Sequence, residues 1–189
     1  MYSFFSFVNR MKYINRWSLM KNSETENLAM HSQQVAIIAH ALCVIGNVYF
    51  GKNLDAGKAA AMALYHDSAE VMTGDMPTPI KYSNEEIKIA YKAIERASEE
   101  KIRMMLPQEL RQTYLPLISG DDSYEHRLVK QADKLSAYLK CIDERKSGNR
   151  EFLKAEKSIK AELVALVGDE LEYFMEHFLA AYELSLDEI

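Results

Sequence analysis

Apolar residues recur every three or four positions along most of the chain, the spacing that gathers them on one face of an α-helix. This spacing predicts an amphipathic first helix over residues 4–14. The run from His31 to Ile45 is almost entirely apolar, which predicts a central helix buried on most of its sides. The alternation of apolar and polar residues that is typical of strands is nearly absent, so we expect an all-α fold.

Capping residues, glycines and prolines predict where the other helices begin and end. Asp55 can cap a helix that runs towards Val71, after which Gly74, Pro77 and Pro79 impose a loop. The segment Ser83–Glu86 has the spacing of a capping box and opens a long polar helix. Further helices are expected from Pro107 to before Gly120, over 128–142, from Phe152 to Val167 and from Leu171 to Leu184. No long linker separates them, so we expect about eight helices in one compact domain over residues 1–189.

The composition is that of an ordinary globular protein, with 48% hydrophobic and 27% charged residues in 189. The formal net charge is −5 and no stripe of Lys and Arg stands out, so long nucleic acid is not an expected partner.

No stretch approaches the ~18 uninterrupted apolar residues of a membrane span, and the apolar start of the chain lacks the basic region of a signal peptide. Cys43 and Cys141 lie in apolar stretches without metal-site spacing, which indicates buried thiols in a reducing cytoplasm.

The segment Tyr65–Glu70 brings three groups that can bind a metal ion or move a proton to the end of an otherwise apolar helix. His66 and Asp67 diverge by about 100° on a helix, yet both can lean onto one ion between them. Glu70 lies four residues after His66 and three after Asp67, so it is expected on their face of the helix. Incidental polar residues at a solvated helix end are the alternative, and the segment by itself leaves both interpretations open.

A second polar residue in an apolar setting favours a metal site. His31 opens the most apolar helix of the chain, where a single histidine is usually a core residue with a hydrogen-bond partner. One cation held by His31, His66 and Asp67 would explain why polar residues occur in both of these apolar helices. Asp133, on the flank of another apolar helical face, is the preferred fourth ligand. The acids and histidines without such a position are left out of the site: Asp143, Glu144, His40, His126 and His177.

Two histidines and two aspartates form a mixed nitrogen and oxygen donor set. This set lacks the thiolates of a structural zinc site and leaves coordination positions for water and substrate. It suits one divalent transition metal such as Mn²⁺, Co²⁺ or Fe²⁺, with Zn²⁺ or Mg²⁺ less favoured. We therefore expect Co²⁺ or Mn²⁺ as the cofactor.

His31, the pair His66-Asp67 and Asp133 resemble the H…HD…D signature of HD-superfamily phosphohydrolases, and within them the bacterial 5′-deoxynucleotidase family. The resemblance covers nearly the whole chain. It includes the segments Ile14–Trp17, Thr25–Asn27, His31-Ser32, Tyr65–Asp67, Thr73–Pro79, Lys130–Asp133 and Leu184–Ile189. One departure is Met30, where family members often carry an acid before the first histidine. This departure affects a contact that supports His31 rather than the ligand itself.

The resemblance implies a homodimer of compact helical subunits that hydrolyses deoxyribonucleoside 5′-monophosphates and favours 2′-deoxy over ribo sugars. It places the metal ligands at His31, His66, Asp67 and Asp133, three of which (His31, Asp67 and Asp133) would also contact the substrate. It implies a phosphate-orienting residue at Arg16 with Trp17 beside it and a catalytic acid at Glu70. It places a substrate loop at Asp75, Met76, Pro77 and Thr78.

The chemistry of these residue types agrees with such roles. The planar fork of Arg16 can grip two phosphate oxygens, which a lysine cannot do. Asp75 follows Gly74 and precedes Pro77, so it lies on a stiff loop where its carboxylate can accept a hydrogen bond from the sugar 3′-hydroxyl. A plain turn residue is the alternative for Asp75.

Two other functions stay open from the sequence. Another HD-type nucleotide phosphohydrolase is the first, although a triphosphate substrate would call for more Lys and Arg near the motifs than Arg16 and Lys81. A non-catalytic helical module that binds nucleotides or a protein is the second. A mere scaffold has no reason to bury groups as costly as those of this site.

Overall fold

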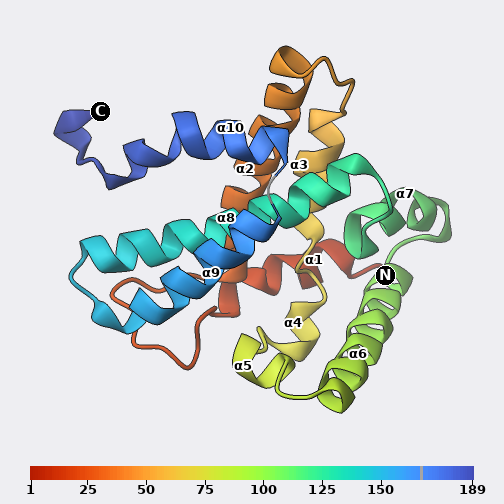
Figure 1. The fold of residues 1–189 in the computed structure, drawn as a ribbon. Helices are drawn as coiled ribbons and strands as arrows, with labels where there is room; N and C mark the ends of the chain where they lie inside the picture. The colour runs from red at the N-terminus through yellow and green to blue at the C-terminus, as the bar shows by residue number, and fades with distance from the viewer. Residues whose placement is uncertain (167) are drawn as a thin grey trace.

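The computed structural model describes residues 1–166 and 168–189, which fold into helices joined by loops (Figure 1). These residues contain no strand, and one isolated bridge joins Asn15 to Asn27. The α-helices are α1 Phe4–Val8, α2 Leu28–Tyr49, α3 Ala56–Tyr65, α4 Glu70–Thr73, α5 Thr78–Lys81, α6 Glu85–Met104, α7 Gln108–Ser119, α8 Tyr124–Lys146, α9 Leu153–Ala165 and α10 Asp169–His177. The 3₁₀ segments are η1 Asn9–Tyr13, η2 Arg150–Phe152, η3 Leu179–Glu183 and η4 Leu186–Glu188. The all-α prediction is confirmed.

Helices α2, α3 and α8 pack against one another at the centre of the molecule. Most of the large, fully buried apolar side chains of the main core come from them, among them Ile38, Leu42, Met62, Leu135 and Leu139, while Phe152 is contributed by η2. Within the described residues, α2 is the one helix long and apolar enough to cross a membrane. However, 56% of the relevant window is buried inside the protein, which is typical of a core helix. The predicted central helix is therefore present, with its ends at Leu28 and Tyr49.

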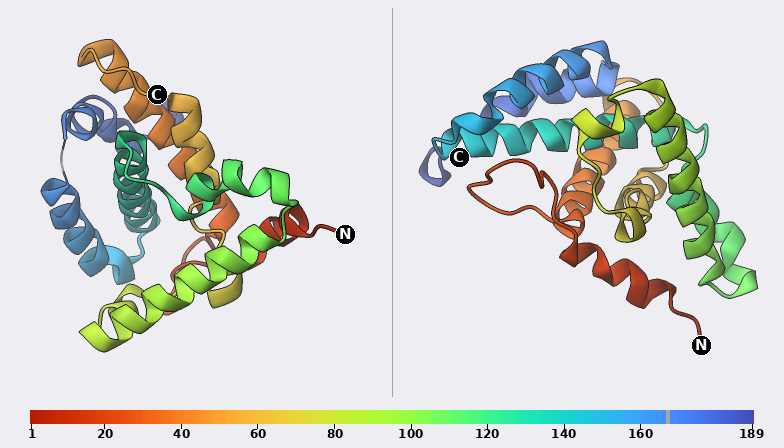
Figure 2. Two further views of the ribbon diagram at one scale, coloured as in Figure 1. Left: turned by 90° about the vertical axis from the view of Figure 1, so that its right-hand side faces the viewer. Right: turned by 90° about the horizontal axis from the view of Figure 1, so that it is seen from below.

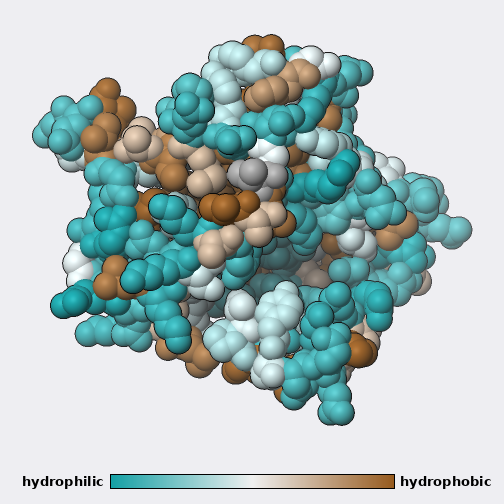
Figure 3. Space-filling view, in the orientation of Figure 1, coloured by the Kyte–Doolittle hydropathy of each residue, from teal (hydrophilic) through white to brown (hydrophobic). Residues whose placement is uncertain are grey.

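The remaining helices flank this centre on two sides. Figures 1 and 2 show α9 and α10 on one side and α6 and α7 on the other, with α1 close to α6. A second, smaller apolar cluster around Phe4, Ile102 and Leu106 joins α1 to α6 and to the segment before α7. Hydrophilic residues cover most of the face drawn in Figure 3, and this face is hollowed between α8 and the segment with α4 and α5.

The segment that carries the His-Asp pair differs from the prediction. The helix expected from Asp55 towards Val71 ends at Tyr65, and the chain turns through residues 66–69 before α4 begins at Glu70. Hydrogen bonds from Ser68 N to Tyr65 O and from Glu70 N to Asp67 O close tight turns of the i to i+3 kind. The prediction that His66, Asp67 and Glu70 share one helical face is therefore wrong, because His66 and Asp67 lie in a turn rather than in a helix.

Several helix ends also differ from the predictions. Asn84, not Ser83, caps α6 by accepting a hydrogen bond from Ile87 N at 2.8 Å, so no capping box forms at Ser83. The first helix tightens into η1 after Val8, and the last one ends at His177 and continues as η3. The expected end of the helix at Val167 lies outside the described residues.

Candidate active site

Three separate segments bring the predicted metal ligands together. His31 lies in the first turn of α2, His66 and Asp67 follow α3, and Asp133 lies in the first half of α8. His31 Nε2 is 3.0 Å from Asp133 Oδ1 and 3.6 Å from Asp67 Oδ2, while His66 Nε2 is 3.2 Å from Asp67 Oδ2. Ligand atoms of His31, His66 and Asp133 all lie within 4.8 Å of one another. All four residues thus face one small volume.

The outer nitrogen of each histidine ring has a partner that fixes the direction of the ring. His66 Nδ1 lies 2.7 Å from the carbonyl oxygen of Ala63, one turn earlier in α3. His31 Nδ1 lies 3.2 Å from Ser136 Oγ, and this hydroxyl donates to Gln34 Oε1 at 2.6 Å. Both rings therefore direct Nε2 towards the two aspartates. Partners of this kind on the far nitrogen are a regular feature of metal-binding histidines.

The electrostatics of the cluster fit a bound cation. Burial lowers the pKa of His66, which keeps its imidazole neutral as a metal ligand requires. Burial alone would raise the pKa of Asp133, but its contact with His31 and the nearby Arg16 hold that pKa well below its usual range. His66 Nε2 is buried without a hydrogen-bond partner. A nitrogen so placed, beside two carboxylates, fits a divalent transition metal with mixed nitrogen and oxygen ligands.

Arg16 and Trp17 lie next to this cluster on the loop between η1 and α2. Arg16 is held in place by its backbone N–H, which donates to Glu26 O at 2.9 Å, and by its Nη1, which lies 3.4 Å from Asp67 Oδ2. Burial alone would lower the pKa of Arg16, but Asp67 and Asp133 raise it, so the guanidinium stays charged. The ring of Trp17 packs on Phe152, with the centroids 5.3 Å apart.

Glu70 and Asp75 flank the other side of Asp67. Burial, together with the neighbouring charges of Asp67 and Asp75, raises the pKa of Glu70 to about 9. Glu70 Oε2 is buried without a hydrogen-bond partner. Burial also raises the pKa of Asp75, whose Oδ2 accepts a hydrogen bond from Trp17 N at 3.3 Å. Gly74, with a φ of 75°, ends α4 and turns the chain towards Asp75 in a conformation that favours glycine.

The rest of the predicted substrate loop is less closely tied to the cluster. Met76 and Pro77 are half-buried, and Thr78 is exposed at the start of α5. The carbonyl oxygens of Pro77 and Thr78 accept backbone hydrogen bonds from Ile80 and Tyr82. Their part in binding substrate stays a prediction.

The sequence reasoning did not find two side chains that the structure places beside the site. Glu26 is buried between Arg16 and His31, and Ser136 lies behind His31. Glu26 stood inside a segment of the family resemblance, yet a single acid in a loop gave no reason to assign it a role. The departure from the family at Met30 concerned the contact that supports His31. In the structure His31 Nδ1 is next to Ser136 Oγ, and the Met30 side chain is exposed.

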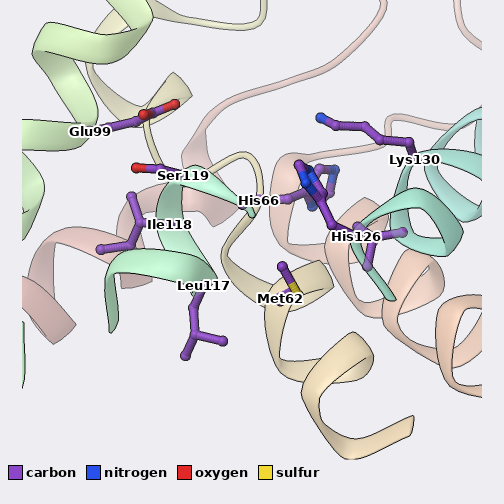
Figure 4. Close-up of a pocket in the computed structure, with 10 residues that line it drawn as sticks. Met62, His66, Glu99, Leu117, Ile118, Ser119, His126 and Lys130 are labelled. Carbon is purple, nitrogen blue, oxygen red and sulfur yellow. The ribbon is translucent and has the colours of Figure 1, made fainter. Parts of the chain in front are cut away.

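A small cavity of about 60 Å³ lies on another side of His66, between α6, α7 and α8. Figure 4 shows His126 and Lys130 close to His66, with Glu99 and Ser119 across the cavity. His126, to which no role was assigned, therefore lies near a predicted metal ligand. Its ring packs against Gly120 and leaves no room for a Cβ at that position.

Comparisons with known proteins agree with this arrangement. The family model described as 5′-deoxynucleotidase YfbR-like matches residues 3–182. The 5′-deoxynucleotidase YfbR of Shigella dysenteriae serotype 1 is 51% identical over an alignment that covers 98% of this chain and 94% of that protein.

Two solved structures share the fold. An HD-domain phosphohydrolase of Listeria innocua is 22% identical, with a TM-score of 0.81 over 95% of this chain and 88% of the other. The HD phosphohydrolase of cyanophage S-2L, bound to dA and one catalytic Zn²⁺ ion, is 19% identical, with a TM-score of 0.67 over 94% of this chain and 95% of the other. With the family model and the 51% identical relative covering nearly the whole chain, the protein belongs to the 5′-deoxynucleotidase YfbR-like family.

Proposed function

We propose that the protein is a metal-dependent 5′-deoxynucleotidase, which converts deoxyribonucleoside 5′-monophosphates to deoxyribonucleosides and phosphate. The observation that carries the proposal is the meeting of His31, His66, Asp67 and Asp133 with Arg16 in one partly buried cluster. The relatives that share half of the sequence carry the name of this activity.

His31, His66, Asp67 and Asp133 would hold one divalent transition metal, and their mixed donor set favours Co²⁺ or Mn²⁺. When bound, such an ion would supply positive charge to offset that of the phosphate and Lewis acidity to lower the pKa of water towards neutral. Because His66 Nε2 forms no hydrogen bond within the protein, this nitrogen is free to act as a ligand.

Arg16 binds the phosphate of the substrate in this proposal. Its guanidinium is fixed before substrate arrives, because Nε donates to Glu26 Oε2 at 3.1 Å and Nη1 lies beside Asp67. A guanidinium that is already oriented loses little conformational freedom when it grips phosphate oxygens.

Glu70 is the proton donor of the reaction. With its pKa raised to about 9, its carboxyl group holds a proton at neutral pH. Glu70 Oε2 can therefore deliver a proton to the sugar 5′-oxygen as the bond from that oxygen to phosphorus breaks. The acid then regains its proton from water.

Asp75, Trp17 and the residues Met76, Pro77 and Thr78 would bind the sugar. Asp75 already uses Oδ2 to hold the backbone of Trp17. We assign its other oxygen to the 3′-hydroxyl of a deoxyribose. Asp75 follows Gly74, the residue that caps the short helix carrying Glu70, so the two acids lie on one compact segment.

We further propose a cytoplasmic homodimer in which residues 1–189 form one domain. An apolar groove of about 830 Å³ between α2, α10 and η3 offers a surface for a second copy, with Val44, Val48, Tyr49 and Phe178 among its lining residues. Burial raises the pKa of Cys43 and Cys141 to about 12, so neither thiol is reactive and both suit a reducing compartment. Light scattering on the purified protein should give twice the chain mass.

Phosphate release from a panel of nucleotides tests the function. Deoxyribonucleoside 5′-monophosphates should be hydrolysed faster than ribonucleoside 5′-monophosphates, and 3′-monophosphates hardly at all. Chelation should abolish the activity, and Co²⁺ or Mn²⁺ should restore it. Faster hydrolysis of triphosphates would favour another HD-type nucleotide hydrolase. No hydrolysis with any metal would favour a non-catalytic nucleotide-binding module.

A further inference from the structure

One carboxylate oxygen connects the two residues that stand beside the metal cluster. Glu26 Oε2 accepts hydrogen bonds from Arg16 Nε at 3.1 Å and from Trp17 Nε1 at 2.9 Å. The second oxygen, Oε1, lies 4.0 Å from His31 Nδ1. Glu26 as a whole is only 8% exposed, so these contacts are shielded from water. Hydrogen bonds to a buried, ionised acceptor are among the strongest in proteins.

Trp17 needs such support because of its backbone. Its φ of 58° lies in the left-handed region, and Trp17 is the one residue other than glycine with a positive φ in the described part of the chain. A bulky residue in this conformation is strained and persists only when its surroundings hold it. The surroundings hold Trp17 from two sides, because Asp75 accepts from its backbone N–H and Glu26 from its indole N–H.

The loop that carries Glu26 is itself anchored to α8. The buried carboxylate of Glu144 accepts a hydrogen bond from Ser23 N at 2.8 Å. Lys140 Nζ donates to Glu24 O and also pairs with Glu144. The backbone around Glu26 is therefore fixed relative to α8, and the hydrogen bonds of the Glu26 carboxylate fix Arg16 and Trp17 in turn.

We propose that Glu26 is a positioning residue that sets the distance and direction between the phosphate-binding Arg16 and the indole of Trp17. The inference rests on the proposed function, in which Arg16 and Trp17 contact opposite parts of one nucleotide. Glutamine is a poor replacement, because its uncharged oxygen is a weaker acceptor for Arg16 and Trp17 than the carboxylate, and its amide nitrogen would take the place of Oε1, 4.0 Å from His31 Nδ1. Losing Glu26 should therefore weaken nucleotide binding more than the chemical step.

The fluorescence of Trp17 makes the inference directly measurable, since the chain has one tryptophan. Glu26→Gln should shift the emission of Trp17 and increase its quenching by acrylamide. With deoxyadenosine 5′-monophosphate, KM should rise about tenfold or more, the effect of losing one charged hydrogen bond, while kcat changes much less. Metal content should stay at the wild-type level. Glu24→Gln is the matched control, because Glu24 is an exposed acid of the same loop, and all these readouts should stay unchanged.

A double-mutant cycle decides whether Glu26 acts through Trp17. The cycle uses Glu26→Asp, so it still tests the proposal if Glu26→Gln is poorly folded. Trp17→Phe keeps an aromatic ring for Phe152 but removes the indole N–H. In the Trp17→Phe background, Glu26→Asp should cost clearly less in kcat/KM than it does alone. Additive effects of the two substitutions would overturn the proposal, and so would unchanged emission in Glu26→Gln. A loss of metal in Glu26→Gln would also overturn it, because Glu26 would then act on His31. If the wild type releases no phosphate, the proposed function fails, while emission and nucleotide-binding titrations still test Glu26.

Discussion

Individual carboxyl groups of the cluster are tuned in opposite directions by their surroundings. Burial and the charges of Asp67 and Asp75 raise the pKa of Glu70 to about 9, whereas contact with His31 keeps the pKa of Asp133 low in spite of burial. One group therefore keeps a proton at neutral pH while another, a few ångströms from His66, stays ionised. Two carboxyl groups with separated pKa values are the usual basis for dividing acid and ligand roles in one site.

Replacing Glu70 should remove the proton donor and leave the metal in place. Glu70→Gln should lower kcat on a deoxyribonucleoside 5′-monophosphate by about 10²–10⁴-fold, the usual contribution of a general acid, with KM little changed. Steady-state kinetics and metal analysis of the same sample check this. Glu99→Gln is the control, because burial also raises the pKa of Glu99, yet this acid lies across the cavity on another side of His66. Loss of metal in Glu70→Gln would make Glu70 a ligand instead.

The raised pKa of Glu70 also predicts how the stability of the metal-free protein depends on pH. The unfolded chain releases this proton near its ordinary pKa of 4.5, while the folded chain keeps it up to about 9. The folded state thus binds more protons between these values, so its free energy of unfolding falls as the pH rises through this range. In the presence of a chelator, Tm should decrease from pH 6 to pH 9, and less so in Glu70→Gln. An equal decrease in both proteins would show that Glu70 ionises normally.

At the scale of elements, helix α6 ties down the short helices on either side of the Asp75 loop. Lys81, in α5, pairs with Glu95 at 2.7 Å and lies over the ring of Tyr91, 4.7 Å from its centroid. The hydroxyl of Tyr91 donates to Thr73 Oγ1, at the end of α4, at 3.3 Å. The loop between Thr73 and α5 is therefore held at both ends by one face of α6.

Loosening this support should affect substrate binding moderately. The Lys81–Glu95 pair is about one quarter exposed, so it is worth up to about 1 kcal/mol. Glu95→Gln should therefore raise KM up to about fivefold and lower Tm by no more than about 4 °C, with kcat nearly unchanged. Glu85→Gln, which breaks the more exposed Glu85–Lys88 pair of the same helix, should change neither constant. A fall in kcat without a change in KM would argue that the loop serves the chemical step instead.

The sequence predicted the existence of the helices better than the local geometry that forms the site. The periodic apolar residues of α2, α3 and α8 decide which faces are buried, and the pattern displays them directly. The turn through residues 66–69 lies between α3 and α4, and the spacing of apolar residues along the chain does not reveal a turn of this kind. The contacts of Glu26 could not be predicted either. They depend on the backbone bridge between Asn15 and Asn27, which brings two loop segments together.

At the scale of the whole molecule, the candidate metal site is also a junction of the fold. Its ligands come from α2, from the turn after α3 and from α8, the elements that together make the main core. An ion bound there would cross-link all three. Because an ion that binds the folded state and not the unfolded one shifts the equilibrium towards folding, metal binding should stabilise the entire protein, with a gain that grows with metal concentration.

The contribution of one ligand to this junction can be separated from its contribution to catalysis. Asp133→Asn keeps the shape of the side chain but removes the charge beside His31, so the variant should bind less metal and lose most of the rise in Tm that Co²⁺ or Mn²⁺ gives the wild type. Asp143→Asn, an exposed change ten residues later on the same helix, should keep the full rise. Calorimetry of chelated and metal-loaded samples measures both. If metal loading raises the Tm of the wild type but not that of Asp133→Asn, each compared with its own chelated sample, the stabilisation passes through the ion, as the convergence of the three segments requires. An undiminished gain in Asp133→Asn would remove Asp133 from the ligand set and leave His31, His66 and Asp67 as the ligands.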